Sequence, residues 1–534
     1  MKHVFIVFLY LIPGNLIVSA QNADTLRSID NLFSGWNNST PGGAVAIARG
    51  NKIIYQKAYG LADLEHNVPN TIETIFECGS VSKQFTAISI LLLAQEGKLS
   101  LQDDVRKYVS ELPVYQAPIK IQHLLNHTSG LKDWGSIGEL AGWPRTTRVY
   151  TQELALEIIC RQKSLNFPPG SEYSYSNSNY SLLVSIVERV SGQTLAEFTS
   201  KRLFEPIGMN HTQWRNNFRQ VIPNRSIAYS KPGANYIQNM PFENVHGHGG
   251  LLTTTSDLIK WDQILDTHKI GGDAVAGLRV QKGKLNNGEE IHYAAGLFID
   301  QWNGFVQIQH SGATAGYRAW LAYYPQKKIS VALLSNDANF NPFGVGIQIA
   351  EIFLGKSVVK AKEPVFTSVT GAELAKWQGT YKEIGGSDVF ALEYNGGKIL
   401  SNGHTLNTIH SDTLYLDGVK WVDSKAGSIQ LQNSSGIRHY ARVNSPNLTA
   451  GYLAALNGNY YSDDAEVGFT ITVKGNEVWA FRRPATSFQL KPAYLDGFLT
   501  NDFELYEFQR DKGGKVKSFE VSKSRAARVP FKKQ

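Results

Sequence analysis

Residues 76–87, FECGSVSKQFTA, place Ser80 three residues before Lys83, at the start of a long apolar segment. Apolar side chains recur at helical spacing as far as Gly97, which predicts a helix that begins near Ser80. Residues three apart share a helix face, so the Lys83 amine can approach the Ser80 hydroxyl. Free backbone N–H groups at a helix start also favour incoming negative charge. The pattern makes Ser80 a candidate nucleophile, with simple helix capping as the alternative.

The S-x-x-K spacing is weak evidence by itself, because this chain contains it three times. Ser357 lies in an expected linker, and Ser129 lies in the turn-like segment HTSGLKDWG, residues 127–135. Only Ser80 opens a predicted helix. Placement along the chain therefore favours Ser80 with Lys83 as the reactive pair.

Length and composition allow several domains. The chain has 534 residues, 42% of them hydrophobic and 19% charged, so it can bury more than one core. The formal charge of +7 arises from 53 basic and 46 acidic residues spread along the chain, with no uninterrupted basic block. No nucleic-acid-binding module is recognisable, so we expect no nucleic-acid partner. Cys78 and Cys160 are too few for a disulfide framework, and we expect both to be small buried apolar residues.

Residues 1–20 are typical of an export signal. Lys2 and His3 precede an apolar run over residues 4–12, and small residues follow where a peptidase would cut. The run is too short to cross a bilayer, and no later segment approaches the roughly 20 residues required. We therefore expect a secreted or periplasmic protein that begins near Gln21 and has no integral membrane segment after signal removal.

Residues 21–355 mix helices and strands in a pattern typical of one large domain. Strands predicted within 42–60 and 304–336 lie at opposite ends of this region, and helices predicted at 151–162 and 179–192 lie between them. Strands at both ends indicate that distant segments pair in one sheet, which predicts an α/β or α+β fold large enough to hold a cleft.

Residues 356–366 predict a linker, after which helical periodicity almost disappears. Short alternating strands separated by Gly, Asn and Asp turns replace it. WQGTYK at 377–382 and LNGNYYSDD at 456–464 each open a run of about 75 residues, which indicates a repeat. Two small antiparallel β units, sandwich-like or barrel-like, are the simplest interpretation, at 367–448 and 449–534.

Two further motifs strengthen the interpretation of Ser80 as a nucleophile. Y-S-N at residues 175–177 follows a Pro/Gly turn, and H-S-G at 310–312 ends an apolar strand. In order, S-x-x-K, Y-x-N and H-S-G resemble the signature elements of the serine β-lactamase and penicillin-binding protein superfamily. The tyrosine indicates the class C-like branch, which includes D-alanyl-D-alanine carboxypeptidases, D-aminopeptidases and esterases. The resemblance covers roughly residues 25–355.

A serine hydroxyl is a poor nucleophile and needs a neighbouring base. Tyr175 with an ordinary pKa would be ionised about one time in a thousand at pH 7. A lysine ammonium about 4 Å away would offset a shortfall of this size. The sequence leaves open whether Lys83 or Tyr175 removes the Ser80 proton, since the two groups would titrate as a coupled pair.

The resemblance implies a catalytic role for each matching position. Ser80 is the acylated nucleophile, Lys83 activates it, and Tyr175 protonates the leaving group. The backbone N–H groups of Ser80 and Ala313 would form the oxyanion hole. The implied fold is a β-lactamase-like (DD-peptidase) α+β domain, with a central antiparallel sheet flanked by helices, followed by two small antiparallel β-barrel units.

Substrate binding is expected at Asn177, His310 and Gly312. His310 stands where class C β-lactamases have a lysine, and a histidine is mostly neutral at pH 7. Histidine at this position occurs in D-alanyl-D-alanine carboxypeptidases and D-aminopeptidases, so the resemblance favours peptidase chemistry over antibiotic resistance. D-aminopeptidases of this group also share the layout of a catalytic domain followed by two eight-stranded barrels.

The expected function is that of an exported serine hydrolase that forms an acyl-enzyme. Its predicted substrates are amide bonds of D-amino-acid-containing peptides, as in a D-aminopeptidase or DD-carboxypeptidase. The alternatives are a carboxylesterase with the same Ser-Lys-Tyr site, a class C-like β-lactamase and a non-turnover penicillin-binding protein. A small peptide, amide or ester is therefore the expected binding partner.

A metal-dependent mechanism is not expected. His246 and His248 could form a metal-binding pair, but no carboxylate or cysteine is spaced to complete the site. The zinc motif H-E-x-x-H and the nucleophile elbow G-x-S-x-G of α/β-hydrolases are both absent from the sequence. We therefore expect two structural histidines, no metal and no cofactor.

Overall fold

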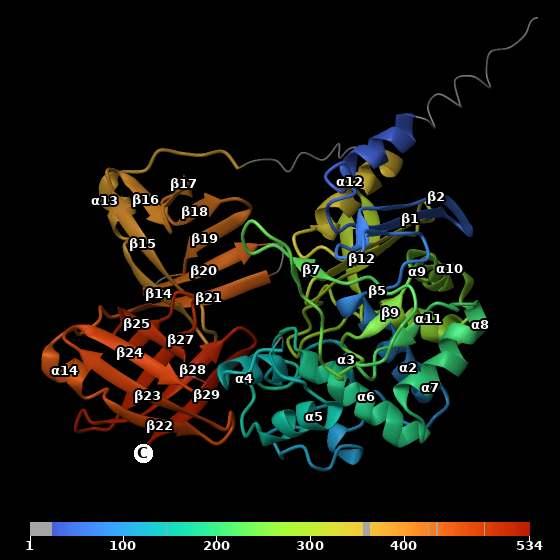
Figure 1. The fold of residues 1–534 in the computed structure, drawn as a ribbon. Helices are drawn as coiled ribbons and strands as arrows, with labels where there is room; N and C mark the ends of the chain where they lie inside the picture. The colour runs from blue at the N-terminus through green and yellow to red at the C-terminus, as the bar shows by residue number, and fades with distance from the viewer. Residues whose placement is uncertain (1–23, 146, 356–363, 425–426, 434–435, 485) are drawn as a thin grey trace, which may run out of the picture.

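The computed structural model shows an α+β domain followed by two closed β-barrels, which confirms the predicted fold class and decides between sandwich and barrel (Figure 1). The predicted export signal and most of the predicted linker lie outside the described residues. The structure describes residues 24–145, 147–355, 364–424, 427–433, 436–484 and 486–534.

The central sheet of the first domain joins strands from both ends of its sequence. Strand β1 (Gly43–Arg49) pairs with β13 (Ile329–Ser335) in antiparallel register, which sets Val45 opposite Leu333. The strand order is β10-β11-β12-β13-β1-β2. The other four strands are β2 (Lys52–Tyr59), β10 (Phe298–Trp302), β11 (Phe305–Thr314), β12 (Tyr317–Tyr324).

Side-chain alternation explains why both faces of this sheet are covered. Ala46 and Leu334 face the large core that contains α2 (Lys83–Gln95). Val45 and Leu333 point the opposite way, into a core shared with α12 (Pro342–Leu354). Successive strand residues point to opposite faces, so apolar residues at every position require helices on both sides.

The remaining elements of the domain surround this sheet. Short strand pairs are β3 (Leu61–Asp63) with β4 (Val68–Pro69), β7 (Tyr229–Ser230) with β8 (Ile237–Gln238), and the three-stranded group β5 (Phe76–Glu77), β9 (Leu251–Thr253), β6 (Gln213–Trp214). The other helices are η1 (Gly79–Ser82), η2 (Val105–Lys107), α3 (Ile121–Leu125), α4 (Trp134–Leu140), α5 (Gln152–Arg161), α6 (Asn177–Ser191), α7 (Leu195–Thr199), η3 (Ser200–Phe204), α8 (Glu205–Ile207), α9 (Thr255–Asp262), α10 (Ile264–Thr267), α11 (Gly272–Val280). Residues 24–32 are also helical.

No helix in the described segments combines the length and hydropathy that a bilayer-crossing span requires.

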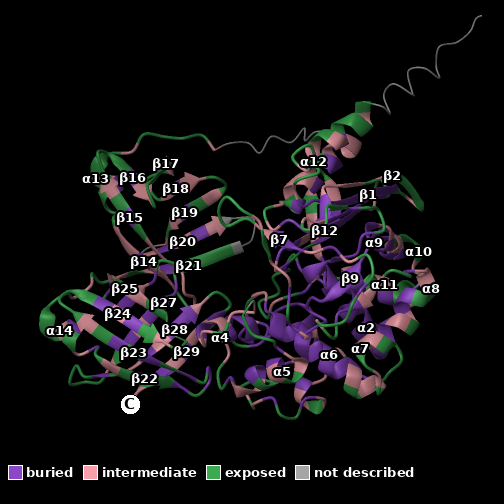
Figure 2. Ribbon diagram, in the orientation of Figure 1, coloured by how far each residue is buried: buried purple, intermediate pink, exposed green. Residues whose placement is uncertain are grey.

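Helix α2 is the central helix of the domain and carries the predicted reactive pair at its start. Its residues 83–93 are all buried, in agreement with a helix that is apolar on every side (Figure 2). The 3-10 helix η1 precedes it and contains Ser80, and α6 packs against it. The predicted helix start near Ser80 is confirmed, with the first turn wound more tightly than an α-helix.

Each barrel has eight antiparallel strands and begins with a short helix, α13 (Gly371–Ala375) or α14 (Ala450–Ala454), which agrees with the predicted repeat. The first barrel consists of β14 (Gly379–Glu383), β15 (Val389–Asn395), β16 (Lys398–Ser401), β17 (His404–His410), β18 (Thr413–Leu416), β19 (Val419–Asp423), β20 (Ser428–Asn433), β21 (Gly436–Val443). The second consists of β22 (Gly458–Ser462), β23 (Val467–Lys474), β24 (Glu477–Arg482), β25 (Thr486–Tyr494), β26 (Gly497–Leu499), β27 (Leu505–Arg510), β28 (Val516–Lys523), β29 (Ala526–Lys533).

The second barrel is joined to the first domain by hydrogen bonds and lies beside α4 and α5 (Figure 1). The Gln162 side-chain amide donates to the Asp464 carbonyl at 2.8 Å, and Arg482 donates to the Leu140 carbonyl at 2.7 Å. In each bond, a side chain of one domain donates to a backbone carbonyl of the other domain. The barrel is therefore positioned to present part of its surface to the domain that carries Ser80.

A buried ion pair fixes the strand that leads into η1. Glu77 ends β5, three residues before Ser80, and its carboxylate accepts from Arg215 Nε at 2.7 Å and from Arg215 Nη2 at 3.1 Å. Both side chains are buried, with exposed fractions of 0% and 1%. Burial alone would raise the pKa of Glu77, but the Arg215 charge holds it below the usual value.

The first prediction concerns this pair. Glu77→Gln removes the closer carboxylate of Arg215 and leaves only Glu243, 4.0 Å away and shared with Arg145, so we expect the free energy of unfolding to fall by about 3 kcal/mol. The matched control is Glu111→Gln, which breaks the exposed pair with Arg189 and should cost at most about 1 kcal/mol. Urea unfolding of the full chain measures both values. Equal losses in the two variants would contradict the role given to the buried pair.

Candidate active site

The structure brings Ser80, Lys83 and Asn177 into direct contact. Lys83 Nζ lies 3.1 Å from Ser80 Oγ, 3.0 Å from Asn177 Oδ1 and 2.6 Å from the His248 carbonyl oxygen. Lys83 comes from the first turn of α2, and Asn177 comes from the first residue of α6. The packing of α2 against α6 therefore brings Asn177 to the predicted pair of Ser80 and Lys83.

The surroundings of Lys83 favour its neutral amine. The side chain is fully buried, and burial, with the nearby positive charge of Arg525, lowers the pKa of Lys83 well below its usual range. A neutral amine has two N–H groups and one lone pair. It can donate to the two acceptors, Asn177 Oδ1 and the His248 carbonyl, and keep its lone pair for the Ser80 proton. This arrangement is that of a general base beside a nucleophile.

Tyr175 also lies at the site, but its environment differs from the one anticipated from the sequence. Lys83 Nζ lies over the ring, 4.7 Å from its centroid. Burial raises the pKa of Tyr175, although the Ser80 hydroxyl favours the ionised form. The buried Tyr175 hydroxyl has no partner within normal hydrogen-bond geometry among the described residues. Burial thus disfavours the phenolate at Tyr175, whereas it favours the neutral amine at Lys83.

Asp133 holds Asn177 in place and was missed by the sequence analysis. Its Oδ2 accepts from the Asn177 backbone N–H at 2.6 Å, while its Oδ1 accepts from the Ser136 N–H at 3.1 Å and so caps α4. One carboxylate therefore connects the starts of α4 and α6. The available signal was an aspartate directly before the apolar residues of a short helix, which is typical of an N-cap.

Strand β11 places Gly312 and Ala313 against η1. A side chain at Gly312 would collide with the Cys78 carbonyl, and its Cβ would also lie 3.0 Å from the Ser80 nitrogen. A Cβ on Gly79, whose φ is +51°, would lie 2.6 Å from the Ala313 nitrogen. The close approach of the two backbones needs glycine at both positions. The backbone segments that carry Ser80 and Ala313, the two residues predicted to form the oxyanion hole, therefore lie in close contact.

His310 is neutral and has partners for both ring nitrogens. Nε2 lies 3.0 Å from the Tyr293 hydroxyl, and Nδ1 lies 2.6 Å from the Ser311 carbonyl oxygen. Burial lowers the pKa of His310 to about 3. The Ser311 carbonyl can only accept, so Nδ1 carries the proton and Nε2 accepts from Tyr293. The residue offers no positive charge at neutral pH, as its chemistry in the sequence suggested.

These residues surround a cavity of about 630 Å³. Ser80, Tyr175 and Asn177 line it, and so do the β11 residues His310, Gly312 and Ala313. Lys83 lies beneath its wall. Further lining residues that the sequence analysis did not identify are Arg145, His248, Phe298, Arg318, Phe343, Arg525. A volume of this size accommodates a short peptide or a similar small molecule.

The other S-x-x-K occurrence in the first domain is not a reactive pair. Lys132 Nζ donates to the carbonyl and the hydroxyl of Ser164, at 2.6 and 2.9 Å. Ser129 Oγ donates instead to Asn179 Oδ1 at 2.5 Å. Cys78, also near Ser80, is a free buried thiol whose pKa burial raises to about 12. Ser129 is thus engaged in a hydrogen bond away from Lys132, and the Cys78 thiol is buried in its protonated form, so neither residue is a second candidate nucleophile.

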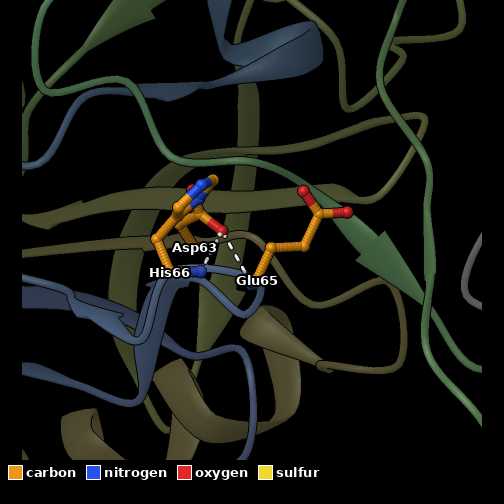
Figure 3. Close-up of side chains that lie close together, drawn as sticks. All are labelled: Asp63, Glu65 and His66. Carbon is orange, nitrogen blue, oxygen red and sulfur yellow. Dashed lines mark hydrogen bonds and ion pairs between the residues drawn. The ribbon is translucent and has the colours of Figure 1, made fainter.

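Among the described residues, one group of side chains could offer three metal ligands: Asp63, Glu65 and His66 (Figure 3). The Asp63 carboxylate already accepts from His66 Nδ1 at 2.7 Å and from the Glu65 backbone N–H at 2.8 Å. Glu65 and His66 are exposed, and these bonds close a turn between β3 and β4. None of the three lines the cavity, so the group has no part in the chemistry at Ser80.

Comparison with known proteins agrees with this geometry. Residues 26–352 match the profile of the family described as Beta-lactamase. The chain belongs to the beta-lactamase family. It is 28% identical to a penicillin-binding protein of Bacillus subtilis, over 79% of this chain and 93% of the relative. It is 25% identical to a D-aminopeptidase of Brucella anthropi, over 84% and 83% of the two chains.

A solved structure shares the fold. A penicillin-binding protein homologue from Pyrococcus abyssi superposes with a TM-score of 0.54 at 24% identity. The match covers 88% of this chain and 99% of that one, so it extends beyond the first domain. With the family established, the chain is a serine hydrolase of the beta-lactamase superfamily, related to D-aminopeptidases and penicillin-binding proteins.

The second prediction follows from the lowered pKa of Lys83. The acylation rate of Ser80 should rise with pH as Lys83 loses its proton, with a midpoint well below the ordinary lysine value. Lys83→Arg keeps a cation at the position but cannot act as a base, so we expect a loss of about 100-fold or more. The rate of labelling by an uncharged fluorophosphonate, followed from about pH 5 to about pH 10, measures both effects. A midpoint at or above the ordinary lysine value would exclude Lys83 as the base.

Proposed function

We propose that this protein is an exported hydrolase that cleaves amide bonds in D-amino-acid-containing peptides through an acyl-enzyme on Ser80. The observation that carries the proposal is the contact of a buried lysine amine with the Ser80 hydroxyl at the edge of a peptide-sized cavity. Burial lowers the pKa of this amine, which supports Lys83 as the base without a histidine.

In the proposed reaction, Ser80 Oγ attacks the substrate carbonyl carbon while Lys83 Nζ accepts its proton. The carbonyl oxygen becomes negatively charged and is stabilised by the N–H groups of Ser80 and Ala313. As the carbon–nitrogen bond breaks, Tyr175 donates its hydroxyl proton to the leaving amine and regains a proton from the Lys83 ammonium. Water then attacks the acyl-enzyme, with Lys83 again as the base, and releases Ser80.

The preference for D-residues is supported by the relatives rather than by the cavity alone. The match to a D-aminopeptidase covers 83% of that protein. It also covers 84% of this chain, so it extends beyond the first domain into the region of the two barrels. Export is supported by residues 1–20, which have the charged start, apolar run and small residues of a signal peptide.

A carboxylesterase with the same Ser80, Lys83 and Tyr175 is the second candidate. The supporting observation is the neutral His310, which supplies no charge to the cavity and so leaves room for an uncharged acyl group. Esters are also more reactive toward an activated serine than amides, so ester hydrolysis accompanies the proposed activity rather than excluding it. The ratio of amide to ester turnover separates the two candidates.

The third prediction tests the nucleophile. Ser80→Ala should abolish fluorophosphonate labelling and all hydrolysis, because the acylated atom is removed. The matched control is Ser89→Ala, which removes a buried hydroxyl from the same helix whose only role is a 2.8 Å bond to the Phe85 carbonyl. Intact-protein mass spectrometry measures the covalent adduct, and circular dichroism confirms that both variants fold.

Substrate pairs then define the activity. D-alanine-containing peptides, p-nitrophenyl butyrate and nitrocefin represent amides, esters and β-lactams. We expect Ser80-dependent turnover of the D-peptide that exceeds that of its L-isomer. Ester turnover with no D-peptide turnover would replace the proposal with the esterase candidate, and undiminished labelling of Ser80→Ala would refute the nucleophile itself.

A further inference from the structure

The second barrel inserts one hairpin turn into the catalytic cavity. Strands β28 and β29 pair through Lys523 and Ala526, which leaves Ser524 and Arg525 as the connecting turn. Ser524 has a φ of +50°, as tight hairpin turns often require. Arg525, at this turn, lines the same cavity as Ser80, although 445 positions separate the two residues in the numbering.

The backbone of the turn is anchored to the first domain. The Arg525 carbonyl accepts from the Asp133 N–H and from Asn166 Nδ2, both at 3.1 Å, and the Arg525 N–H donates to Ser136 Oγ at 3.4 Å. Asn166 Oδ1 also accepts from the Ala527 N–H at 2.9 Å. These bonds involve backbone atoms of the turn only. The position of Arg525 is therefore fixed while its side chain remains available.

The Arg525 guanidinium has no counter-charge. It stacks on Tyr175, with Cζ 4.8 Å from the ring centroid, and it forms no ion pair with any described residue. The two other arginines of the cavity are engaged. Arg145 Nε donates to the Glu243 carboxylate at 2.6 Å, and Arg318 donates to two backbone carbonyls at 2.7 and 2.9 Å.

The cavity offers no negative charge to a substrate. No described residue that lines it is an aspartate or glutamate, and His310 is neutral. An adjoining cavity of about 300 Å³ contains Glu139 and Glu243, and Glu243 is already paired with Arg145. A substrate ammonium group near Ser80 would thus meet an unpaired arginine, whereas a carboxylate there would gain a charge-assisted hydrogen bond.

We infer that Arg525 is a specificity-determining residue that binds a carboxylate on the leaving-group side of the substrate. We place the carboxylate on the leaving-group side because the guanidinium lies over Tyr175, which protonates the leaving nitrogen in the proposed reaction. The inference rests on the proposed function for this assignment. It narrows the substrate class to acylated peptides whose last residue carries a free carboxylate, which is carboxypeptidase-type rather than aminopeptidase-type cleavage.

The fourth prediction compares two ligands that differ only in this charge: an N-acetylated peptide that ends in D-alanyl-D-alanine and the same peptide as its C-terminal amide. Each is used as a competitor against labelling of Ser80 by an uncharged fluorophosphonate, with the full-length protein. Competition reports binding whether or not the peptide is cleaved. The ratio of the two inhibition constants within one variant also cancels any change in the reactivity of Ser80.

In the wild-type protein the acid should bind about 10- to 100-fold more tightly than the amide, the range expected for a charge-assisted hydrogen bond. Arg525→Gln should remove this preference by weakening the acid, with the amide changed by less than about 3-fold. Arg525→Lys should restore part of it. Lys517→Gln, which removes an exposed charge from the same hairpin, should leave the preference intact.

The inference is overturned if the wild type shows no preference for the acid, or if Arg525→Gln retains the preference. The proposed function fails separately, if neither peptide is turned over while labelling still depends on Ser80. Loss of labelling in Arg525→Gln with a changed circular dichroism spectrum would show misfolding. In that case Arg525→Lys, which preserves the charge and the backbone anchors, decides the inference by its own acid-to-amide ratio.

Discussion

The chemistry of this protein depends on the cost of burying a charge at Lys83. An ammonium group taken out of water without a carboxylate partner is destabilised by several kcal/mol, so burial lowers the pKa of Lys83 and favours its neutral amine. The three groups within reach of Nζ, which are Ser80 Oγ, Asn177 Oδ1 and the His248 carbonyl, are all uncharged. They match a neutral amine, which donates twice and accepts once. The same burial therefore favours the neutral amine beside Ser80 that the proposed mechanism needs.

This arrangement requires that segments distant in sequence be held to a fraction of an ångström. The Glu77–Arg215 pair fixes the chain just before η1, and Asp133 fixes the first residue of α6. The Asp133 backbone N–H also donates to the Arg525 carbonyl, so the barrel hairpin and the catalytic lysine are connected through one short chain of hydrogen bonds. A buried charge that is paired resists displacement strongly, because separation leaves both partners unsolvated.

Sequence reasoning found Ser80, Lys83 and Tyr175 because each lies in a short local motif at a helix start or turn, and it found the α+β domain because periodicity is local too. It could not find Arg525, since "SKSRAARV" has the composition of any basic surface turn and its contact with Tyr175 depends on how two domains pack. The His248 carbonyl is a backbone group with no sequence signal. Burial, which raises the pKa of Tyr175, is a property of the assembled core and has no local sequence signal.

The barrel turn also explains how a site with a neutral histidine can still recognise charge. Arg525 supplies a cation that stacks on the Tyr175 ring and takes no part in the hydrogen bonds of Lys83. The charge still lowers the pKa of Lys83 through space. A carboxylate bound to Arg525 would partly neutralise that influence, so ligand binding and the strength of the base are coupled in this site. In this proposal Arg525 both binds the substrate carboxylate and, through the pKa of Lys83, influences the reactivity of Ser80.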